Sequence, residues 1–424
     1  MKFSVITRTT VFLLLTLPFG FSACVKDVCK RTMTYTFYEP VYKTKAEVRA
    51  NIKSNPAKQV QNPGKLYIRG NYIFLNDVDR GIHIINNANP SSPQNVAFID
   101  IPGNMDIAVK GNTLYADLYT DLVTLDITNP LQVVVKKINE NIFPHRYYGG
   151  GYTGGPNDKV VVDWVRNDTT VTEDCDNGGW WGNRGDVFLS SASAGPPSGG
   201  NIGSAGSPIG QGGSMARFAI MNDRLYTVGI SDLDVFNITN TEDPVKTTRV
   251  TIGWNIETIY PFQNKLFIGS MSGMFIYNVS NPDAPVHAGQ FNHVRTCDPV
   301  IADNDYAYVT LRSGTPCQGF TNELDVLQLN NFINPTLVKV YQLKNPKGLS
   351  KDGNYLFICD EGLKIYNAAN VTSLQMLKHV TNIETFDVIA YNNIALVVAS
   401  DGLYQFDYSD INNVRQISKI SVSH

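Results

Sequence analysis

Charged residues recur at one place in this 424-residue chain, at or beside the start of each copy of a repeated sequence pattern. They are Lys65, Asp106, Arg217, Glu257, Asp298, Lys347 and Asp387. Their signs mostly alternate, which suits a solvated ring of neighbouring ion pairs. The same ring could instead hold a polar ligand or a cation. Two unpaired carboxylates about 5–10 Å apart, one with a raised pKa, could also cleave a glycosidic bond as acid and base.

The repeated pattern is about forty residues long, and its clearest copies are 67–93, 108–130, 260–285 and 349–370. Each copy has a β-like run, a turn at Asn or Gly, a second run, a tight loop and a third run that ends in an Asn/Asp-rich turn. Copies aligned on the residue before the first turn follow one another at intervals of 41, 111, 41, 41, 49 and 39 residues. Those aligned residues are Arg69, Lys110, Met221, Phe262, Asp303, Asp352 and Tyr391. Seven copies are therefore visible.

A fourth run follows most copies, for example at 95–102, 131–138 and 414–422. Such units cannot bury their apolar faces alone, and radial closure protects their edges. The pattern predicts an all-β fold, a seven-bladed β-propeller of four-stranded antiparallel blades over residues 63–424. Eight blades remain an alternative. Because the first strand of a propeller blade is innermost, the seven charged residues would ring one mouth of the central channel.

The long interval contains an insertion at about 145–214. Residues 158–174 alternate in polarity as a hairpin of two strands would, whereas 178–213 are rich in Gly, Ser and Pro and predict a long loop. The adjacent indoles of Trp180 and Trp181 in this loop could stack on a sugar or insert into a partner. They could equally pack the loop against the propeller.

The N-terminus has the features of a secretory signal over residues 1–23. Basic residues precede an apolar stretch at 11–21, and two small residues stand directly before Cys24. The segment resembles a bacterial lipoprotein signal, which implies that Cys24 becomes the lipidated first residue of the mature chain. An ordinary cleaved signal and an uncleaved anchor are the alternatives. Residues 24–62 would be a tether, in which 32–42 could add a strand to the body.

The remaining cysteines are Cys29, Cys175, Cys297, Cys317 and Cys359, an odd number in a compartment that permits disulfides. Cys297 precedes the first strand of the fifth copy and Cys317 follows its second strand. Because antiparallel strands return to the same end, the sequence predicts a Cys297–Cys317 disulfide that contributes roughly 2–4 kcal/mol. A bond from Cys359 to Cys175 or Cys297 is the alternative. The Cys and His spacings predict no metal site.

The third runs share a recognisable motif. It is seen in LVTLDITNP at 122–130, LDVFNITN at 233–240, MFIYNVSNP at 274–282, LDVLQLN at 324–330 and GLKIYNAAN at 362–370. The motif resembles the LVIVD repeat of secreted and lipid-anchored bacterial proteins. The resemblance implies a propeller in the cell envelope and brings no catalytic residue. The organisation is similar to that of Bacteroidota envelope lipoproteins.

A net charge of −3 gives no basic excess, so the composition argues against a nucleic-acid partner. No Ser/His/Asp spacing stands out, and we assign no catalytic residue, cofactor or metal. We predict a non-enzymatic lipoprotein anchored to the outer membrane, at its periplasmic face or the cell surface, that binds a protein or glycan or acts as a scaffold. The alternative is a polysaccharide hydrolase or lyase that uses Glu257, Asp298 and Asp387.

Overall fold

The computed structural model describes residues 30–143, 159–174, 188–189, 211–293, 299–314 and 320–422. The chain divides into two compact units, residues 1–39 with 166–194 and residues 40–165 with 195–424. Within the described ranges, no helix is long and apolar enough to span a bilayer.

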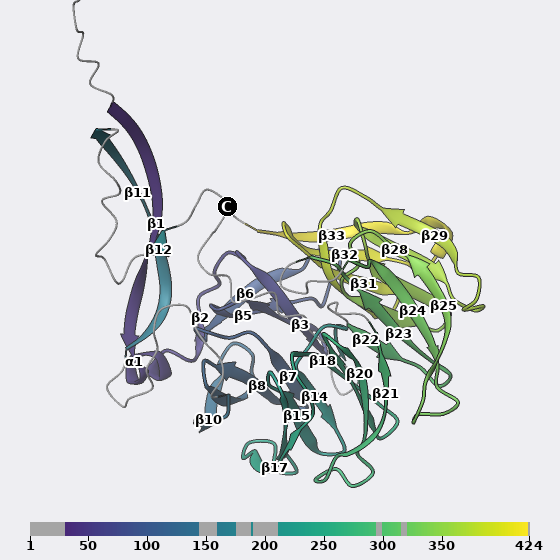
Figure 1. Cartoon of the computed structure of the whole chain (residues 1–424). Coiled ribbons are helices and arrows are strands. Elements are labelled where there is room, and N and C mark those ends of the chain that lie inside the picture. The colour runs from purple at the N-terminus through teal and green to yellow at the C-terminus, as the bar shows by residue number, and fades with distance from the viewer. Residues whose placement is uncertain are drawn as a thin grey trace, which may run out of the picture. The chain divides into compact units, whose positions relative to one another are not determined.

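The second unit is a seven-bladed propeller, and its blades follow one another in chain order (Figure 1). Each blade is built from four consecutive antiparallel strands, and the first strand is innermost. Blades 1 to 4 are β3 (Pro63–Arg69), β4 (Tyr72–Asp77), β5 (Gly81–Asn86) and β6 (Gln94–Asp100); β7 (Ile107–Lys110), β8 (Thr113–Leu118), β9 (Asp121–Asp126) and β10 (Val134–Asn139); β14 (Phe218–Met221), β15 (Arg224–Val228), β16 (Asp232–Asn237) and β17 (Val245–Thr251); and β18 (Ile256–Phe262), β19 (Lys265–Ser270), β20 (Gly273–Asn278) and β21 (Val286–Asn292).

The last three blades repeat the same order. They are β22 (Val300–Ala302), β23 (Tyr306–Leu311), β24 (Glu323–Gln328) and β25 (Thr336–Gln342); β26 (Leu349–Asp352), β27 (Tyr355–Cys359), β28 (Leu363–Asn367) and β29 (Gln375–Val380); and β30 (Thr385–Tyr391), β31 (Ile394–Ala399), β32 (Gly402–Asp407) and β33 (Arg415–Ser421), with a 3-10 turn η1 at Ile411–Asn413. The predicted fold class and blade number are confirmed.

Burial along the strands explains why this sequence forms blades. Inner strands are covered on both faces by neighbouring blades, so every residue of β8 is buried. Outer strands have one face toward solvent, and β17 alternates between exposed and half-buried residues. The first turn of the last blade places Asn392 and Asn393 at φ of 51° and 60°. Two positive φ values give the hairpin turn that matches the strand twist.

Blade 1 has additional strands on both sides. On its outer edge, β2 (Ser54–Asn55) pairs with β6, and it follows the short helix α1 (Lys45–Ala50). On its inner edge, β13 (Gln211–Gly212) pairs with β3. The sequence patterns predicted neither pairing, because both join segments far apart in the chain.

The ring closes between blades 1 and 7 without any exchange of strands. The contact surface is apolar and includes Leu66 and Ile73 of blade 1 and Ile389 and Val398 of blade 7. The amides of Asn87 and Gln405 also exchange two hydrogen bonds, of 3.1 and 2.7 Å. A bridge between Val60 and Val422 adds a backbone link at the same seam.

The described part of the first unit belongs to a three-stranded sheet in the order β11 (Lys159–Asp174), β1 (Lys30–Thr44) and β12 (Phe188–Leu189). The expected hairpin at 158–174 is wrong, because these residues form one continuous strand. Its partner is β1, where Thr32 and Thr34 contact Thr172 and Thr170 through their hydroxyls. The sheet has three strands, whereas each blade has four.

Candidate functional site

The innermost strands bring most of the predicted charged residues to one end of the channel, but their side chains are bound into the structure. Asp106 is fully buried, while Lys65, Lys347 and Asp387 are each no more than 7% exposed. Arg217 and Glu257 are half-buried. Asp298 lies outside the described residues. These six residues therefore do not form an open ring of solvated charges.

Asp387 is fixed by the chain segment that enters blade 3. The Ser214 backbone N–H and hydroxyl donate to Oδ1 of Asp387 at 3.2 and 3.3 Å, and the N–H of Val388 donates at 2.9 Å. The Ser214 hydroxyl oxygen also accepts the N–H of Leu349 in blade 6. Because β13 pairs with blade 1 just before Ser214, this segment joins blades 1, 6 and 7 from inside the channel.

Two glycines allow this close approach. A Cβ on Gly213 would lie 1.9 Å from Oδ2 of Asp387, and one on Gly348 would lie 2.2 Å from Oδ1. Both distances are far inside van der Waals contact. The carboxylate of Asp387 is thus enclosed by backbone on two sides, and it does not face an open cleft.

Burial raises the pKa of Asp387 to about 7, against the lowering effects of the Val388 N–H, of Lys65 and of Ser214. The pKa in the unfolded chain is near 4. Between about pH 4 and 7, Asp387 is therefore protonated in the native state and loses its proton on unfolding. The contribution of this proton to the free energy of unfolding is complete below about pH 4 and is lost as the pH rises through about 7.

We expect Asp387→Asn to remove this pH dependence. Between pH 5 and 8 the free energy of unfolding of the wild type should fall by about 2–3 kcal/mol more than that of the variant. Denaturant titrations of both proteins at the two pH values measure the difference. Parallel pH profiles would show that Asp387 keeps an ordinary pKa in the folded protein.

A buried polar network links blades 1, 2 and 3 at the same end. The Asn76 amide donates to Oδ1 of Asn104 at 2.7 Å, and the Asn104 amide donates to Oδ1 of Asp117 at 2.9 Å. The backbone N–H of Asp106 donates to the same Asp117 oxygen at 2.8 Å. Oδ2 of Asp106 in turn accepts the N–H of Arg217. These groups position the links between blades.

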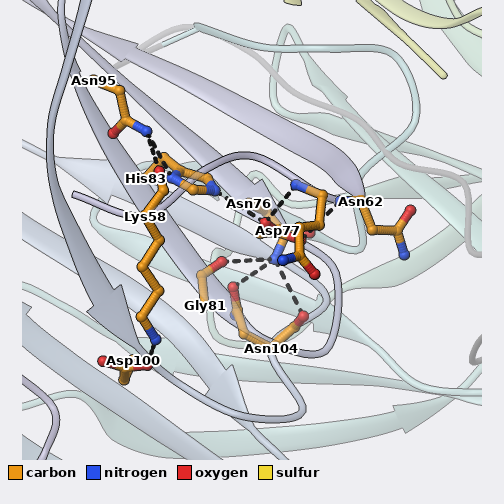
Figure 2. A network of polar contacts seen from close by, with 10 residues as sticks. Lys58, Asn62, Asn76, Asp77, Gly81, His83, Asn95, Asp100 and Asn104 are labelled. Atoms are coloured by element: carbon orange, nitrogen blue, oxygen red, sulfur yellow. Dashed lines mark hydrogen bonds and ion pairs between the residues drawn. The ribbon is translucent and has the colours of Figure 1, made fainter. Parts of the chain in front are cut away.

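Beside this network, Asp77 and His83 form a buried pair, as Figure 2 shows, with Nε2 of His83 3.0 Å from Oδ2 of Asp77. Asp77 also accepts the backbone N–H groups of Gln61 and Asn62, both at 3.0 Å. The other ring nitrogen of His83 lies 3.2 Å from the Asn95 amide. Both carboxylate oxygens of Asp77 and both ring nitrogens of His83 thus have polar neighbours. We call this arrangement, in which a buried carboxylate binds a side chain and the backbone before a first strand, a clamp.

Blade 6 repeats the clamp with a lysine. Oδ2 of Asp360 lies 2.6 Å from Nζ of Lys364, and Oδ1 accepts the N–H groups of Lys344 and Asn345 at 3.1 and 2.7 Å. Here the carboxylate again holds the backbone just before the first strand. A shared Asn-Pro pair, at 62–63 and 345–346, precedes both blades and could have revealed the clamp from the sequence.

Two further predicted residues have charged neighbours. Nζ of Lys347 lies 2.9 Å from the Glu384 carboxylate. Glu257 acts on Arg312, whose pKa is lowered by burial and raised in part by the charge of Glu257. Within the described ranges, no three His, Cys, Asp or Glu side chains cluster as a metal site would require.

Most of the cysteine and tryptophan predictions concern residues outside the described ranges, namely Cys24, Cys29, Cys175, Cys297, Cys317, Trp180 and Trp181. The Cys297–Cys317 disulfide stays a prediction. Cys359 is a buried free thiol whose pKa is raised by burial. The alternative pairing of Cys359 with Cys175 or Cys297 is therefore wrong, because its sulfur is enclosed in the core of blades 6 and 7.

Comparison with known families identifies the repeat. The LVIVD repeat model matches residues 64–99 and 103–138, which are the strands of blades 1 and 2 with their connections. The chain therefore contains LVIVD repeats, as the third-strand motif predicted. No curated protein sequence matches the chain.

Solved propellers are similar in fold at very low sequence identity. A protein from Lactobacillus plantarum has a TM-score of 0.50 and 10% identity, over 92% of this chain and 97% of that chain. The periplasmic gluconolactonase PpgL of Pseudomonas aeruginosa gives the same four values. BamB from Moraxella catarrhalis has a TM-score of 0.45 and 9% identity, over 82% of this chain and 81% of that chain. At 10% identity, the likeness to the first two structures concerns the fold alone.

Proposed function

We propose that this chain is a non-enzymatic binding or scaffold propeller of the bacterial cell envelope. It is held at the outer membrane by lipid on Cys24 and binds a protein or glycan partner. The observation that carries the proposal is that charged side chains at one end of the channel are buried and bound to other groups of the chain. Asp106, Asp387 and Lys347 are engaged by neighbouring backbone and side chains, which suits a scaffold better than a reaction centre.

One observation favours the second candidate, a polysaccharide hydrolase or lyase. A carboxyl group with a pKa near 7, such as Asp387, suits a general acid. That mechanism also needs a second carboxylate and room for a sugar between the two. Asp387 is 5% exposed and packs against Gly213 and Gly348, so a sugar would have to displace the backbone that lies against the carboxylate.

The experiment that separates the two candidates combines affinity capture from the native envelope with a glycan screen of the purified protein. A partner that co-purifies, or a glycan that binds without being shortened, supports the binding role. Depolymerisation of an envelope polysaccharide that Asp387→Asn abolishes would establish the enzyme instead. Variants Trp180→Ala and Trp181→Ala test whether the two indoles contribute to the captured complex.

Lipid attachment gives a separate prediction. We expect Cys24→Ala to abolish labelling of the chain by a fatty-acid analogue and to move it from the membrane fraction to the aqueous fraction. The reason is that several acyl chains on one residue provide stable anchoring, which the propeller alone does not. Cys359→Ala is the matched control and should leave labelling unchanged. A Cys24→Ala protein that still labels and sediments with membranes would contradict the anchor.

A further inference from the structure

One register position of the third strand differs between blades in a way that singles out blade 5. It directly follows the first buried aliphatic residue of that strand. We call it the third-strand position, and it is occupied by His83, Val123, Asp234, Phe275, Asp325, Lys364 and Tyr404. Five of the seven blades thus place a polar or charged group there.

Four of these five groups have a partner in their own blade. His83 lies against Asp77, and Lys364 pairs with Asp360. The Tyr404 hydroxyl donates to Oδ2 of Asp401 at 2.7 Å. Asp234 pairs with two cations, Lys246 at 2.7 Å and Arg249 at 2.6 Å. A buried ionised group is costly without such compensation.

Asp325 is the exception. Its side chain is 4% exposed, and Oδ1 has no hydrogen-bond partner anywhere in the described part of the chain. Glu323 lies two residues away on the same strand and adds a like charge. Burial, and then Glu323, raise the pKa of Asp325 to about 6, while His293 lowers it. Within the described ranges, the carboxylate at the seam of blades 4 and 5 therefore lacks the paired cations that Asp234 has in blade 3.

The fourth strand explains the difference between blades 3 and 5. In blade 3, Arg249 pairs in register with Asp234, and Lys246 stands opposite Phe236. In blade 5, the same two positions are Val340, opposite Asp325, and Leu337, opposite Leu327. Paired residues share one face of the sheet, so both aliphatic side chains lie on the face of Asp325.

These two aliphatic side chains are open to solvent. Val340 is 36% exposed and Leu337 is 48% exposed, and Ile333 in the preceding turn is 65% exposed. A cationic pair in blade 3 has thus been replaced by exposed apolar surface beside a buried carboxylate. An arginine is complementary to this combination, because its stem packs on aliphatic groups and its guanidinium meets a carboxylate through two hydrogen bonds.

We infer that the outer part of blade 5 binds a protein partner through an arginine side chain that passes between Leu337 and Val340 to Asp325. The arginine would make the contact that Arg249 makes with Asp234 in blade 3. An uncharged glycan would leave the carboxylate without a counter-charge. The inference rests on the proposed binding function and specifies the partner's chemistry.

The test uses a defined probe, so it does not depend on the partner's identity or on membrane attachment. Two peptides, acetyl-Ala-Leu-Arg-Ile-Ala-amide and the same peptide with neutral citrulline for arginine, are titrated into the purified full chain by calorimetry or NMR. We expect the arginine peptide to bind at least tenfold more tightly. Equal affinities of the two peptides would overturn the inference, while leaving another binding surface open for the proposed function.

Variants of the chain test whether the arginine peptide binds at Asp325. Asp325→Asn removes the charge and should weaken the arginine peptide at least tenfold, with no loss of melting temperature because an uncompensated charge is removed. Val340→Arg supplies the missing cation within the chain and should abolish binding. Gln290→Arg is the matched control, since Gln290 has the same register position in blade 4, opposite Phe275. It should leave the affinity unchanged, and equal loss with both arginine variants would overturn the site.

A second copy of the chain is distinguished from an external partner by the same variants. A dimer in sedimentation that Asp325→Asn dissociates would identify that second copy as the occupant and overturn an external partner.

Discussion

Replacing Gly402 with alanine is expected to lower the free energy of unfolding by more than about 3 kcal/mol, although it adds a single methyl group. Gly402 begins the third strand of blade 7 with φ of 147°, a conformation that other residues rarely adopt. A Cβ there would lie 2.1 Å from the carbonyl oxygen of Ile420 on the fourth strand. Strain and collision therefore act together, and the neighbouring atom is backbone that cannot move aside.

The same geometry recurs in three of the other six blades. Gly81 and Gly273 begin third strands at positive φ, and Gly362 directly precedes β28 at positive φ. In each, the Cβ would lie 2.0–2.5 Å from a fourth-strand carbonyl oxygen. Gly353→Ala is the matched control. Gly353 lies in a first turn at φ of 54° with nothing within 4 Å of its Cβ, so we expect a cost of about 1 kcal/mol. Denaturation of both variants should separate them, and equal losses would contradict the close approach of the two strands.

Asp360→Ala should have a comparable effect, a loss of about 3–5 kcal/mol, because it leaves the charge of Lys364 buried without a partner. Lys364 is 8% exposed and Asp360 is 1% exposed. The variant also removes the acceptor for the backbone N–H groups of Lys344 and Asn345, which hold the link into blade 6.

A double-mutant cycle separates the charge from the backbone contacts. Lys364→Met should cost less than Asp360→Ala, because the carboxylate keeps its two backbone donors. Adding Lys364→Met to Asp360→Ala should recover at least about 1 kcal/mol, since the orphaned ammonium is removed. If the two losses simply add, the pair does not interact, and the clamp consists of backbone contacts alone.

The fold was predictable because its determinants are local and repeated. Short runs of alternating or fully apolar residues, joined by turns such as Asn392-Asn393, specify antiparallel strands within one blade. Seven copies at a period near forty then require mutual stacking. The structure confirms seven blades of four strands, and the six predicted charged residues that it describes lie at or beside the start of first strands.

Pairings between distant segments could not be predicted in this way. The long strand β11 has the alternation of a hairpin, but its partner β1 is more than a hundred residues earlier in the chain. The two-residue strands β2 and β13 carry no periodic signal at all. They exist because blade 1 offers an outer edge and an inner edge for pairing.

The interaction partners of the charged residues could not be predicted from the sequence either. Alternating signs suggested pairs between neighbouring blades, whereas Asp106 and Asp387 accept backbone N–H groups, and Lys347 pairs with Glu384 outside the predicted ring. The role of Asp325 depends on which fourth-strand residue stands opposite. The bulge in each outer strand shifts that register, so only the structure places Val340 where blade 3 has Arg249.

The most direct test of the propeller as a binding module is site-specific photocrosslinking in intact cells. A photoreactive amino acid is placed at Val340, and in a control chain at Leu131, which is 51% exposed on blade 2. We predict a discrete crosslinked complex with one envelope protein from position 340, none from position 131, and loss of the complex when Asp325→Asn is added. No discrete product from position 340, together with a polysaccharide that the purified chain shortens, would contradict the binding role.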